Sequence, residues 1–290
     1  METESNLQKS FVLITGASSG IGKALAFEFA SRHENLLLVA LPETGLEDTG
    51  LELKMQFGIE VNTLCTDLTV PGSTAGVLHW CRVNFFKVRV LVNNAGFGTL
   101  QLFENSDPHV LCNMMELNNR AVVLLAHLFL PELRRFKQSY LMNVGSLASF
   151  MPIPGKSVYA ASKSFVYAFS HSLYLELRST NIHISCLCPG GTMTPRVQAG
   201  LDEKKFRGKA FCQAPQEVAK VAVKQLYKKK FRIVPGIQNR FLYWLSQILP
   251  MPLKVLIIQA VFRKSSPPAN HMYPLLRNRS LAGSFALIAR

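Results

Sequence analysis

Cysteine is scarce in this sequence, and no two cysteines are spaced as a metal-binding or redox pair. The six stand at positions 65, 81, 112, 186, 188 and 212, so they form no CxxC motif and no regular ladder. This pattern excludes a disulfide-built fold and indicates reduced, mostly buried thiols with no bound metal. The first ten residues are polar and do not resemble a secretory signal peptide. We therefore expect a cytoplasmic protein.

Acidic residues are almost absent from the last part of the chain. Residues 201–290 contain 17 Lys and Arg against three acids, Asp202, Glu203 and Glu217, whereas residues 1–200 contain 15 of each. The whole net charge of +14 therefore comes from the C-terminal region. Such asymmetry indicates either an anionic partner, a nucleic acid or an acidic membrane surface, or a merely solvated face. We expect no nucleic acid, because the region lacks aromatic–basic interleaving and any known binding module.

Short apolar runs alternate with helix-like stretches over most of the chain. Hydrophobic residues make up 48% of the sequence, which excludes global disorder. Continuous runs rich in Val, Leu and Ile are typical of parallel strands buried on both faces. Their alternation with helices predicts an α/β fold with a doubly wound parallel sheet, in one domain over residues 1–230. The predicted strands are 11–15, 36–41, 61–65, 88–92, 140–144 and 182–187, and the clearest helices are 110–137 and 157–178.

A glycine-rich turn joins the first predicted strand to the first predicted helix. Its three glycines would let the backbone approach a pyrophosphate, while the helix N-terminus supplies free N–H groups and its serines add hydroxyl donors. A tight turn without a ligand is the other interpretation of such a cluster. The candidate binding residues here are Gly16, Ser18, Ser19, Gly20, Ile21 and Gly22.

Tyr159 and Lys163 are four residues apart in YAASK, so a helix would place both on one face. A phenol titrates near ~10, and a nearby cation such as the Lys163 ammonium would stabilise its anion. Tyr159 could then protonate a carbonyl oxygen as hydride arrives. Ser146 follows a predicted strand, where its hydroxyl could hold the same oxygen. Tyr and Lys are also commonplace on amphipathic helices, so the pair alone does not decide.

Five motifs occur in one order along residues 10–240. They are TGASSGIG at 15–22, NNAG at 93–96, Ser146, YAASK at 159–163 and PGGTMT at 189–194. In order and spacing they resemble the short-chain dehydrogenase/reductase family, in a layout similar to the bacterial branch near the long-chain 3-oxoacyl and 17β-hydroxysteroid reductases. The resemblance implies a Rossmann fold, a nicotinamide dinucleotide, and a homodimer or homotetramer assembled through the helices 110–137 and 157–178.

The resemblance also implies a role for particular residues. Asn118 in ELNNR matches the family's catalytic Asn, which links Lys163 to solvent through a bound water; a one-residue slip would select Asn119 instead. The NNAG turn would brace the sheet and line the cofactor, and PGGTMT would hold the nicotinamide carboxamide. The implied catalytic set is Asn118, Ser146, Tyr159 and Lys163. The implied cofactor-binding residues include Asn94, Ala95, Gly96, Tyr159, Lys163, Pro189, Gly190, Thr192 and Thr194.

The residues around the expected adenosine site leave the choice between NAD and NADP open. Asp67, which ends the third predicted strand beside Leu68, would suit an adenine amino group or be an ordinary turn residue. Leu41 and Ser19 stand where NADPH-preferring members of the family carry basic residues, and no Asp ends the second strand. Glu43 is a candidate for the ribose hydroxyls, and Lys23 or Arg32 for a 2′-phosphate. The match to carbonyl-reducing members favours NADPH weakly.

The C-terminal region has a different composition from the rest. Residues 241–262 carry one charge, Lys254, but Pro250 and Pro252 split this run into halves too short to cross a bilayer. We expect residues 231–264 to form apolar helices that contact a membrane surface, a substrate, the core or a second subunit. Residues 195–212 match the family's substrate lid, and residues 265–290 show no pattern and are expected to form a flexible tail.

The leading hypothesis is an oxidoreductase that acts on the carbonyl or alcohol of a lipophilic substrate, such as a 3-oxoacyl thioester or a steroid-like ketone. We expect it to work in the cytoplasm or peripherally on the inner face of a membrane. The alternative is a catalytically silent, dinucleotide-sensing or scaffold protein that keeps the fold. Such proteins usually have broken catalytic positions, whereas all four are intact here.

Overall fold

The computed structural model describes residues 9–194, 212–250 and 253–254. Its centre is a seven-stranded sheet in the order β3-β2-β1-β4-β5-β6-β7, with every neighbouring pair parallel. The strands are β1 Ser10–Thr15, β2 Asn35–Ala40, β3 Val61–Cys65, β4 Lys87–Asn93, β5 Ser139–Val144, β6 Ile182–Leu187 and β7 Arg232–Ile233. The predicted doubly wound sheet is therefore confirmed; the short strand β7 was not predicted.

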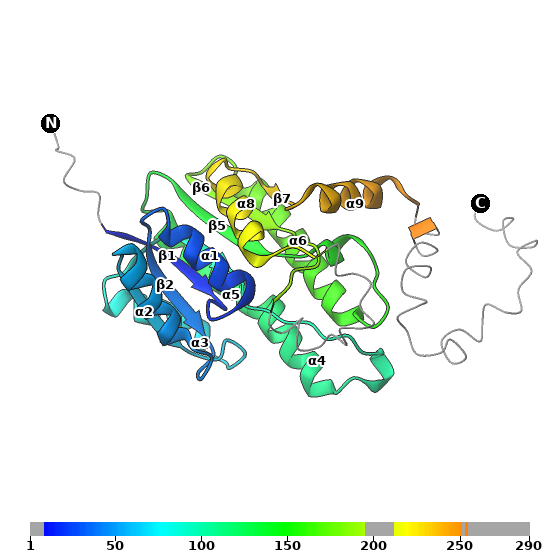
Figure 1. The fold of residues 1–290 in the computed structure, drawn as a ribbon, viewed down its shortest axis with the longest axis horizontal. Coiled ribbons are helices and arrows are strands. Elements are labelled where there is room, and N and C mark those ends of the chain that lie inside the picture. Colours follow the sequence, from blue (N-terminus) through cyan, green and yellow to red (C-terminus); the bar gives the residue numbers. More distant parts are fainter. Residues whose placement is uncertain (1–8, 195–211, 251–252, 255–290) are drawn as a thin grey trace, which may run out of the picture. The chain divides into compact units, whose positions relative to one another are not determined.

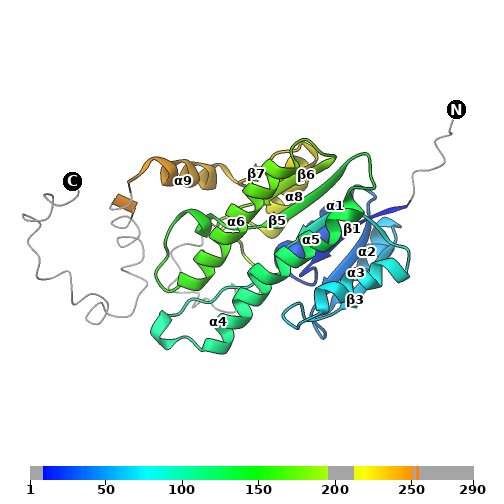
Figure 2. The same cartoon turned by 180° about the vertical axis from the view of Figure 1, so that it is seen from behind.

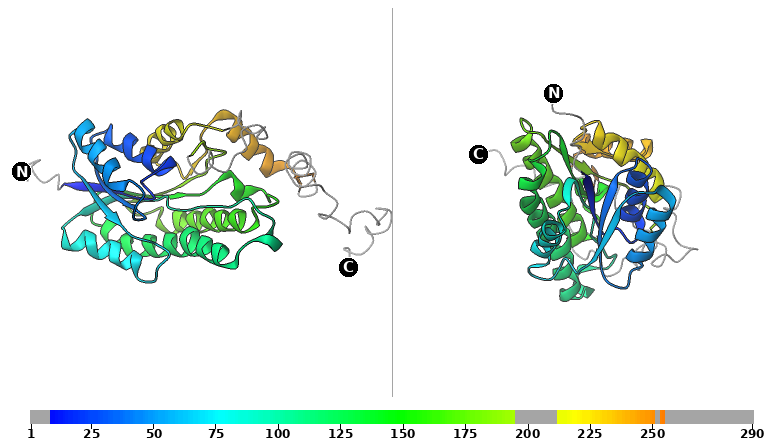
Figure 3. Two further views of the ribbon diagram at one scale, coloured as in Figure 1. Left: turned by 60° about the horizontal axis from the view of Figure 1, so that its bottom comes forward. Right: turned by 90° about the vertical axis from the view of Figure 1, so that its left-hand side faces the viewer.

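Helices cover both faces of the sheet. Figure 1 shows α1 and α8 in front of the strands, and Figure 2 shows α5 and α6 on the opposite face. The view along the sheet in the right half of Figure 3 separates these layers. The helices are α1 Gly20–Ala30, α2 Leu46–Phe57, α3 Ser73–Val83, α4 Pro108–Met115, α5 Val122–Leu133, α6 Ser157–Leu177, α8 Pro215–Tyr227 and α9 Ile237–Ile248.

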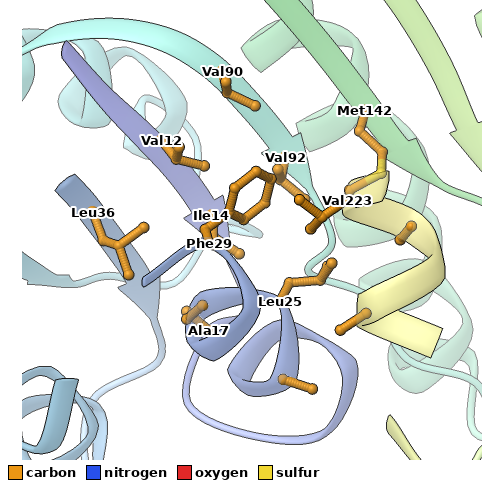
Figure 4. Close-up of a cluster of buried hydrophobic side chains, with 14 of the residues drawn as sticks. Val12, Ile14, Ala17, Leu25, Phe29, Leu36, Val90, Val92, Met142 and Val223 are labelled. Carbon is orange, nitrogen blue, oxygen red and sulfur yellow. The ribbon is translucent and has the colours of Figure 1, made fainter. Parts of the chain in front are cut away.

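The alternation of side chains along β1 explains why two cores form. Val12 and Ile14 point to the face covered by α1 and α8, and Phe11 and Leu13 point to the other face. Because all four are buried, the strand reads as one continuous apolar run. Figure 4 shows the first core, where Phe29 of α1 lies among valine and isoleucine side chains of the sheet.

The order of the strands reverses between β1 and β4, which lie side by side at the centre of the sheet. The chain runs outward from β1 to β3, returns to β4 beside β1, and then continues outward to β7. The loops that follow β1 and β4 consequently leave the sheet in different directions, which is where open α/β sheets bind ligands. The glycine-rich turn and the NNAG turn are these two loops.

The predicted helix over 110–137 is interrupted. It consists of α4, a π-helical turn over Glu116–Ala121 and α5. Turns of this kind occur often at functional sites, and this one contains Asn118. All six cysteines are free thiols, but only Cys81, Cys186 and Cys188 are buried, fewer than expected.

The chain divides into two compact units, Met1–Leu249 and Pro250–Arg290. The first contains the whole sheet and α9. The expected tail over 265–290 and almost all of the expected lid over 195–212 lie outside the described residues, and the boundary expected near residue 230 stays a prediction. Within the described ranges, no helix has both the length and the apolar character needed to cross a bilayer.

Candidate active site

The glycine-rich turn brings the backbone of β1 against the start of α1. Gly16 and Gly20 have φ of +66° and +56°, a region that favours glycine, and a Cβ on Gly22 would lie 2.0 Å from the Gly16 carbonyl oxygen. Ser19 is the N-cap of α1 and makes no side-chain capping hydrogen bond. The turn therefore has the close backbone approach and the open helix N-terminus that a pyrophosphate requires.

The NNAG turn is fastened directly to this turn. The Asn94 side-chain amide donates to the carbonyl oxygens of Thr15 (2.9 Å) and Gly16 (3.1 Å). In return, the Thr15 hydroxyl accepts hydrogen bonds from the backbone N–H groups of Asn94 and Ala95, both at 3.0 Å. Four hydrogen bonds thus hold the two loops together. The sequence did not single out Thr15, whose role appears only when the loops meet.

Lys163 lies on α6, and its side chain reaches the end of β5. Its side chain is buried, and its Nζ donates to the Val144 carbonyl oxygen at 2.9 Å. A Cβ on Gly96 would lie 3.2 Å from that Nζ, so a glycine at this place leaves room for the ammonium. Burial disfavours the charged form and lowers the pKa of Lys163 to about 8.

Tyr159 stands one helical turn before Lys163 and rests against the loop after β4. A Cβ on Gly98 would lie 2.4 to 2.9 Å from three atoms of the Tyr159 ring, so the ring lies closer to the Gly98 backbone than a side chain there would allow. Burial raises the pKa of the Tyr159 phenol, and a hydrogen bond with Ser146 opposes that rise. The expected lowering by Lys163 is absent, because the ammonium is held at Val144 instead.

Ser146 follows β5 and begins a short 3-10 helix over Leu147–Phe150. Its Oγ accepts from the Ala148 backbone N–H at 3.1 Å, which fixes the side chain at the end of the strand. The Pro189 carbonyl oxygen accepts from the Leu147 N–H at 2.9 Å. This bond joins the serine loop to the PGGTMT segment.

Asn118 braces the site through its side chain. Its amide oxygen accepts from the Phe97 N–H at 3.0 Å, and its amide nitrogen donates to the Phe97 carbonyl oxygen (2.9 Å) and the Ser162 hydroxyl (3.0 Å). Asn119 reaches α6 separately, by donating to the Ser162 carbonyl oxygen at 3.0 Å. Asn118 therefore clamps the loop after β4 to α6, and the expected water link to Lys163 stays a prediction.

The PGGTMT segment comes back over the glycine-rich turn. A Cβ on Gly20 would lie 2.9 Å from the Thr194 Cγ2, so the two loops are in close contact. A Cβ on Gly190 would lie 2.3 Å from the Asn239 side-chain oxygen, so α9 packs directly against the segment. Thr192 pairs with Gln213 in an isolated parallel bridge. Asn239 and Gln213 belong to the structural support of the site and were not predicted.

The charged candidates for the adenosine site are already paired with other groups of the protein. Lys23 pairs with Glu52 at 3.1 Å, and Arg32 follows the C-terminal end of α1, where it pairs with Glu28 at 2.8 Å. Arg32 is thus at the opposite end of the helix from the turn, and a role for it or for Lys23 at a 2′-phosphate stays a prediction. The Asp67 carboxylate accepts from the backbone N–H of Thr69 at 2.8 Å, as a turn residue does.

Lys156 is a further residue at the site that the sequence did not indicate. Its Nζ lies 5.7 Å from the centre of the Tyr159 ring, in a cation–π arrangement. Burial lowers the pKa of Lys156. Lys156 and Tyr159 therefore lie together at the start of α6.

Comparison with known proteins identifies the family. A model of the family described as short chain dehydrogenase matches residues 10–205. The chain belongs to that family. The 1-deoxy-11-beta-hydroxypentalenate dehydrogenase of Streptomyces exfoliatus is 31% identical over 238 residues, which are 81% of this chain and 86% of that protein.

Two solved structures in this family have the same fold. A short-chain dehydrogenase from Sphingobium yanoikuyae in complex with NADPH is 28% identical, with a TM-score of 0.72 over 89% of this chain and 96% of that one. The bulky-bulky ketone specific alcohol dehydrogenase from Comamonas testosteroni is 25% identical, with a TM-score of 0.70 over 91% of this chain and 98% of that one. The chain is an NAD(P)-dependent oxidoreductase.

Proposed function

We propose that the protein reduces a bulky, lipophilic ketone or aldehyde, or oxidises the corresponding alcohol, with Tyr159 as the proton-transfer residue. The observation that carries this proposal is the pairing of Tyr159 with Ser146 at the loop after β4, with Lys163 one helical turn further along α6. When bound, the nicotinamide supplies or accepts the hydride. The side chains hold the carbonyl oxygen in position and supply its proton.

The pKa directions suit the direction of reduction. Burial raises the pKa of Tyr159, so its hydroxyl is protonated at neutral pH and ready to donate from Oη to the new alkoxide. The Ser146 hydroxyl, which is hydrogen-bonded to that phenol, holds the same oxygen. Lys163, whose lowered pKa makes its proton easier to release, restores the proton to Tyr159. Asn118 keeps the loop above them in place.

The residues present fit a nicotinamide dinucleotide. Gly16 to Gly22 and the N-terminus of α1 would hold the pyrophosphate, and Asn94, Ala95 and Gly96 would line the ribose beside Lys163. Asp67 and Leu68 would contact the adenine. The segment from Pro189 to Thr194 would hold the carboxamide, since it contacts both the turn and the serine loop.

A bulky ketone as substrate is supported by the name of one similar protein, the bulky-bulky ketone specific alcohol dehydrogenase. The apolar, basic region over 231–264 supports work beside a membrane surface. For the oligomer, we propose a homodimer or homotetramer through α4 to α6, because Met115, Phe165 and Leu175 expose 46 to 53% of their area there.

The test is turnover on a panel of aliphatic, 3-oxoacyl, steroid-like and bulky aromatic ketones, each with NADH and with NADPH. Reduction of the lipophilic members with at least one cofactor is expected, and the cofactor ratio decides the preference that Leu41 leaves open. Binding of both cofactors, without oxidation of either cofactor by any ketone, would instead favour the catalytically silent, dinucleotide-sensing protein.

A further inference from the structure

Helix α9 turns four large apolar side chains outward and two polar side chains inward. Ile237, Phe241, Trp244 and Ile248 are spaced along one face and are 57 to 76% exposed. Asn239 and Ser246, on the opposite face, are buried at 4% and 2% exposure. A helix on the surface of a globular protein normally shows the reverse arrangement. We define the four exposed residues as the α9 stripe.

The inner contacts of α9 fix this orientation. Asn239 donates to Gln213 at 2.8 Å and to the Pro235 carbonyl oxygen at 2.9 Å. The Tyr243 ring lies 4.7 Å from the Phe150 ring and 4.2 Å from the Arg232 guanidinium. Turning the helix to bury the α9 stripe would break these contacts of Asn239 and Tyr243. The outward face is therefore a feature of the folded protein.

The charges around the α9 stripe indicate what covers it. Arg240 lies on α9 itself and is exposed, and no Asp or Glu follows Glu217 in the sequence. A second copy of this chain would bring the same basic residues against each other. An anionic lipid surface offers the opposite charge together with an apolar interior, and Trp and Phe are favoured at its interface.

We propose that the α9 stripe inserts into the interface of a membrane that contains anionic lipid, with Arg240 at the headgroups. The proposal names the membrane partner of the proposed function and does not depend on reductase activity. The inner face of α9 contacts Phe150, in the 3-10 helix after Ser146, and Gly190. Docking through α9 therefore holds the active site near the lipid phase, where a lipophilic ketone collects.

The test uses the full-length protein with Trp80→Phe, which leaves Trp244 as the only tryptophan. Its fluorescence and its flotation are measured with vesicles of phosphatidylcholine alone and of an equal mixture with phosphatidylglycerol. We expect a blue shift and co-flotation with the mixed vesicles, both weakened by salt. Replacing Phe241 and Ile248 by Gln should reduce partitioning on the order of tenfold or more.

The matched control is Met55→Gln, which removes an even more exposed apolar side chain from α2 and should leave partitioning unchanged. Three results would overturn the proposal. Blue emission of Trp244 before vesicles are added would show that the chain or a second copy covers the stripe. Equal binding to both kinds of vesicle would show that anionic lipid is not required. Wild-type binding by the variant with Gln at 241 and 248 would show that the membrane contact lies elsewhere. Because no substrate is present, inactivity on the ketone panel does not affect these readings.

Discussion

Replacing Gly98 by Ala tests whether the loop after β4 positions the Tyr159 ring. The new Cβ would lie 2.4, 2.7 and 2.9 Å from three ring atoms, whereas carbon atoms in contact are separated by about 3.5 to 4.0 Å. The ring must therefore move by roughly 1 Å. A displacement of that size costs on the order of 100-fold in rate, equivalent to about 2.7 kcal/mol in the barrier.

The assay compares kcat/KM, dinucleotide affinity and thermal unfolding of Gly98→Ala with those of Gly76→Ala. Gly76 lies in α3, where a Cβ would meet nothing within 4 Å. That control should keep full activity and gain about 0.5 to 1 kcal/mol of stability from its better helix propensity. A folded Gly98→Ala protein with wild-type kcat/KM would refute the packing of Tyr159 as a determinant of rate.

Three other substitutions test the surroundings of Tyr159. Asn94→Ala removes two hydrogen bonds to the glycine-rich turn and should cost about 1 to 3 kcal/mol of stability and weaken dinucleotide binding; unchanged unfolding and titration curves would contradict that. Gly190→Ala should lose activity by collision with Asn239, and adding Asn239→Ala should restore part of it; a double variant no more active than Gly190→Ala would show that the collision is harmless. Lys163→Met should abolish turnover yet change stability in a pH-dependent way. The folded pKa of about 8 is below the unfolded value, so the cost of burying the cation is full below pH 8 and disappears as the pH rises toward the unfolded pKa. The melting temperature of the Met variant relative to wild type, measured without cofactor, should therefore fall over that window, and a difference independent of pH would contradict the buried cation.

The sheet and its glycine-rich turn could be predicted because their signals are local. A parallel strand buried on both faces needs a continuous apolar run such as 11–15, and a turn from strand to helix at a pyrophosphate needs closely spaced glycines. Tyr159 and Lys163 lie on one helix, so their spacing alone placed them together.

The supports of the site could not be predicted in this way. Gly98 is one of several glycines near NNAG, and its role depends on how the loop after β4 crosses α6. The partner of Lys163 is a backbone carbonyl, at Val144, that carries no side-chain signal. Asn239 stands 49 residues after Gly190 in the sequence and reaches it only through the packing of α9.

The outward apolar face of α9 could not be predicted from the local sequence either. The apolar composition of 241–262 predicted apolar helices, but composition does not say which face packs on the core. That choice is made by the hydrogen bonds of Asn239 and the ring contacts of Tyr243, which come from distant elements.

The central claim is that the Tyr159 hydroxyl transfers the proton that accompanies hydride transfer. The most direct measurement is single-turnover reduction of an accepted ketone by Tyr159→Phe, with dinucleotide affinity measured on the same preparation. Affinity should be kept while the rate falls by about 10²-fold to 10⁴-fold, the usual contribution of a positioned acid. Reduction at the wild-type rate by a folded Tyr159→Phe protein would contradict it.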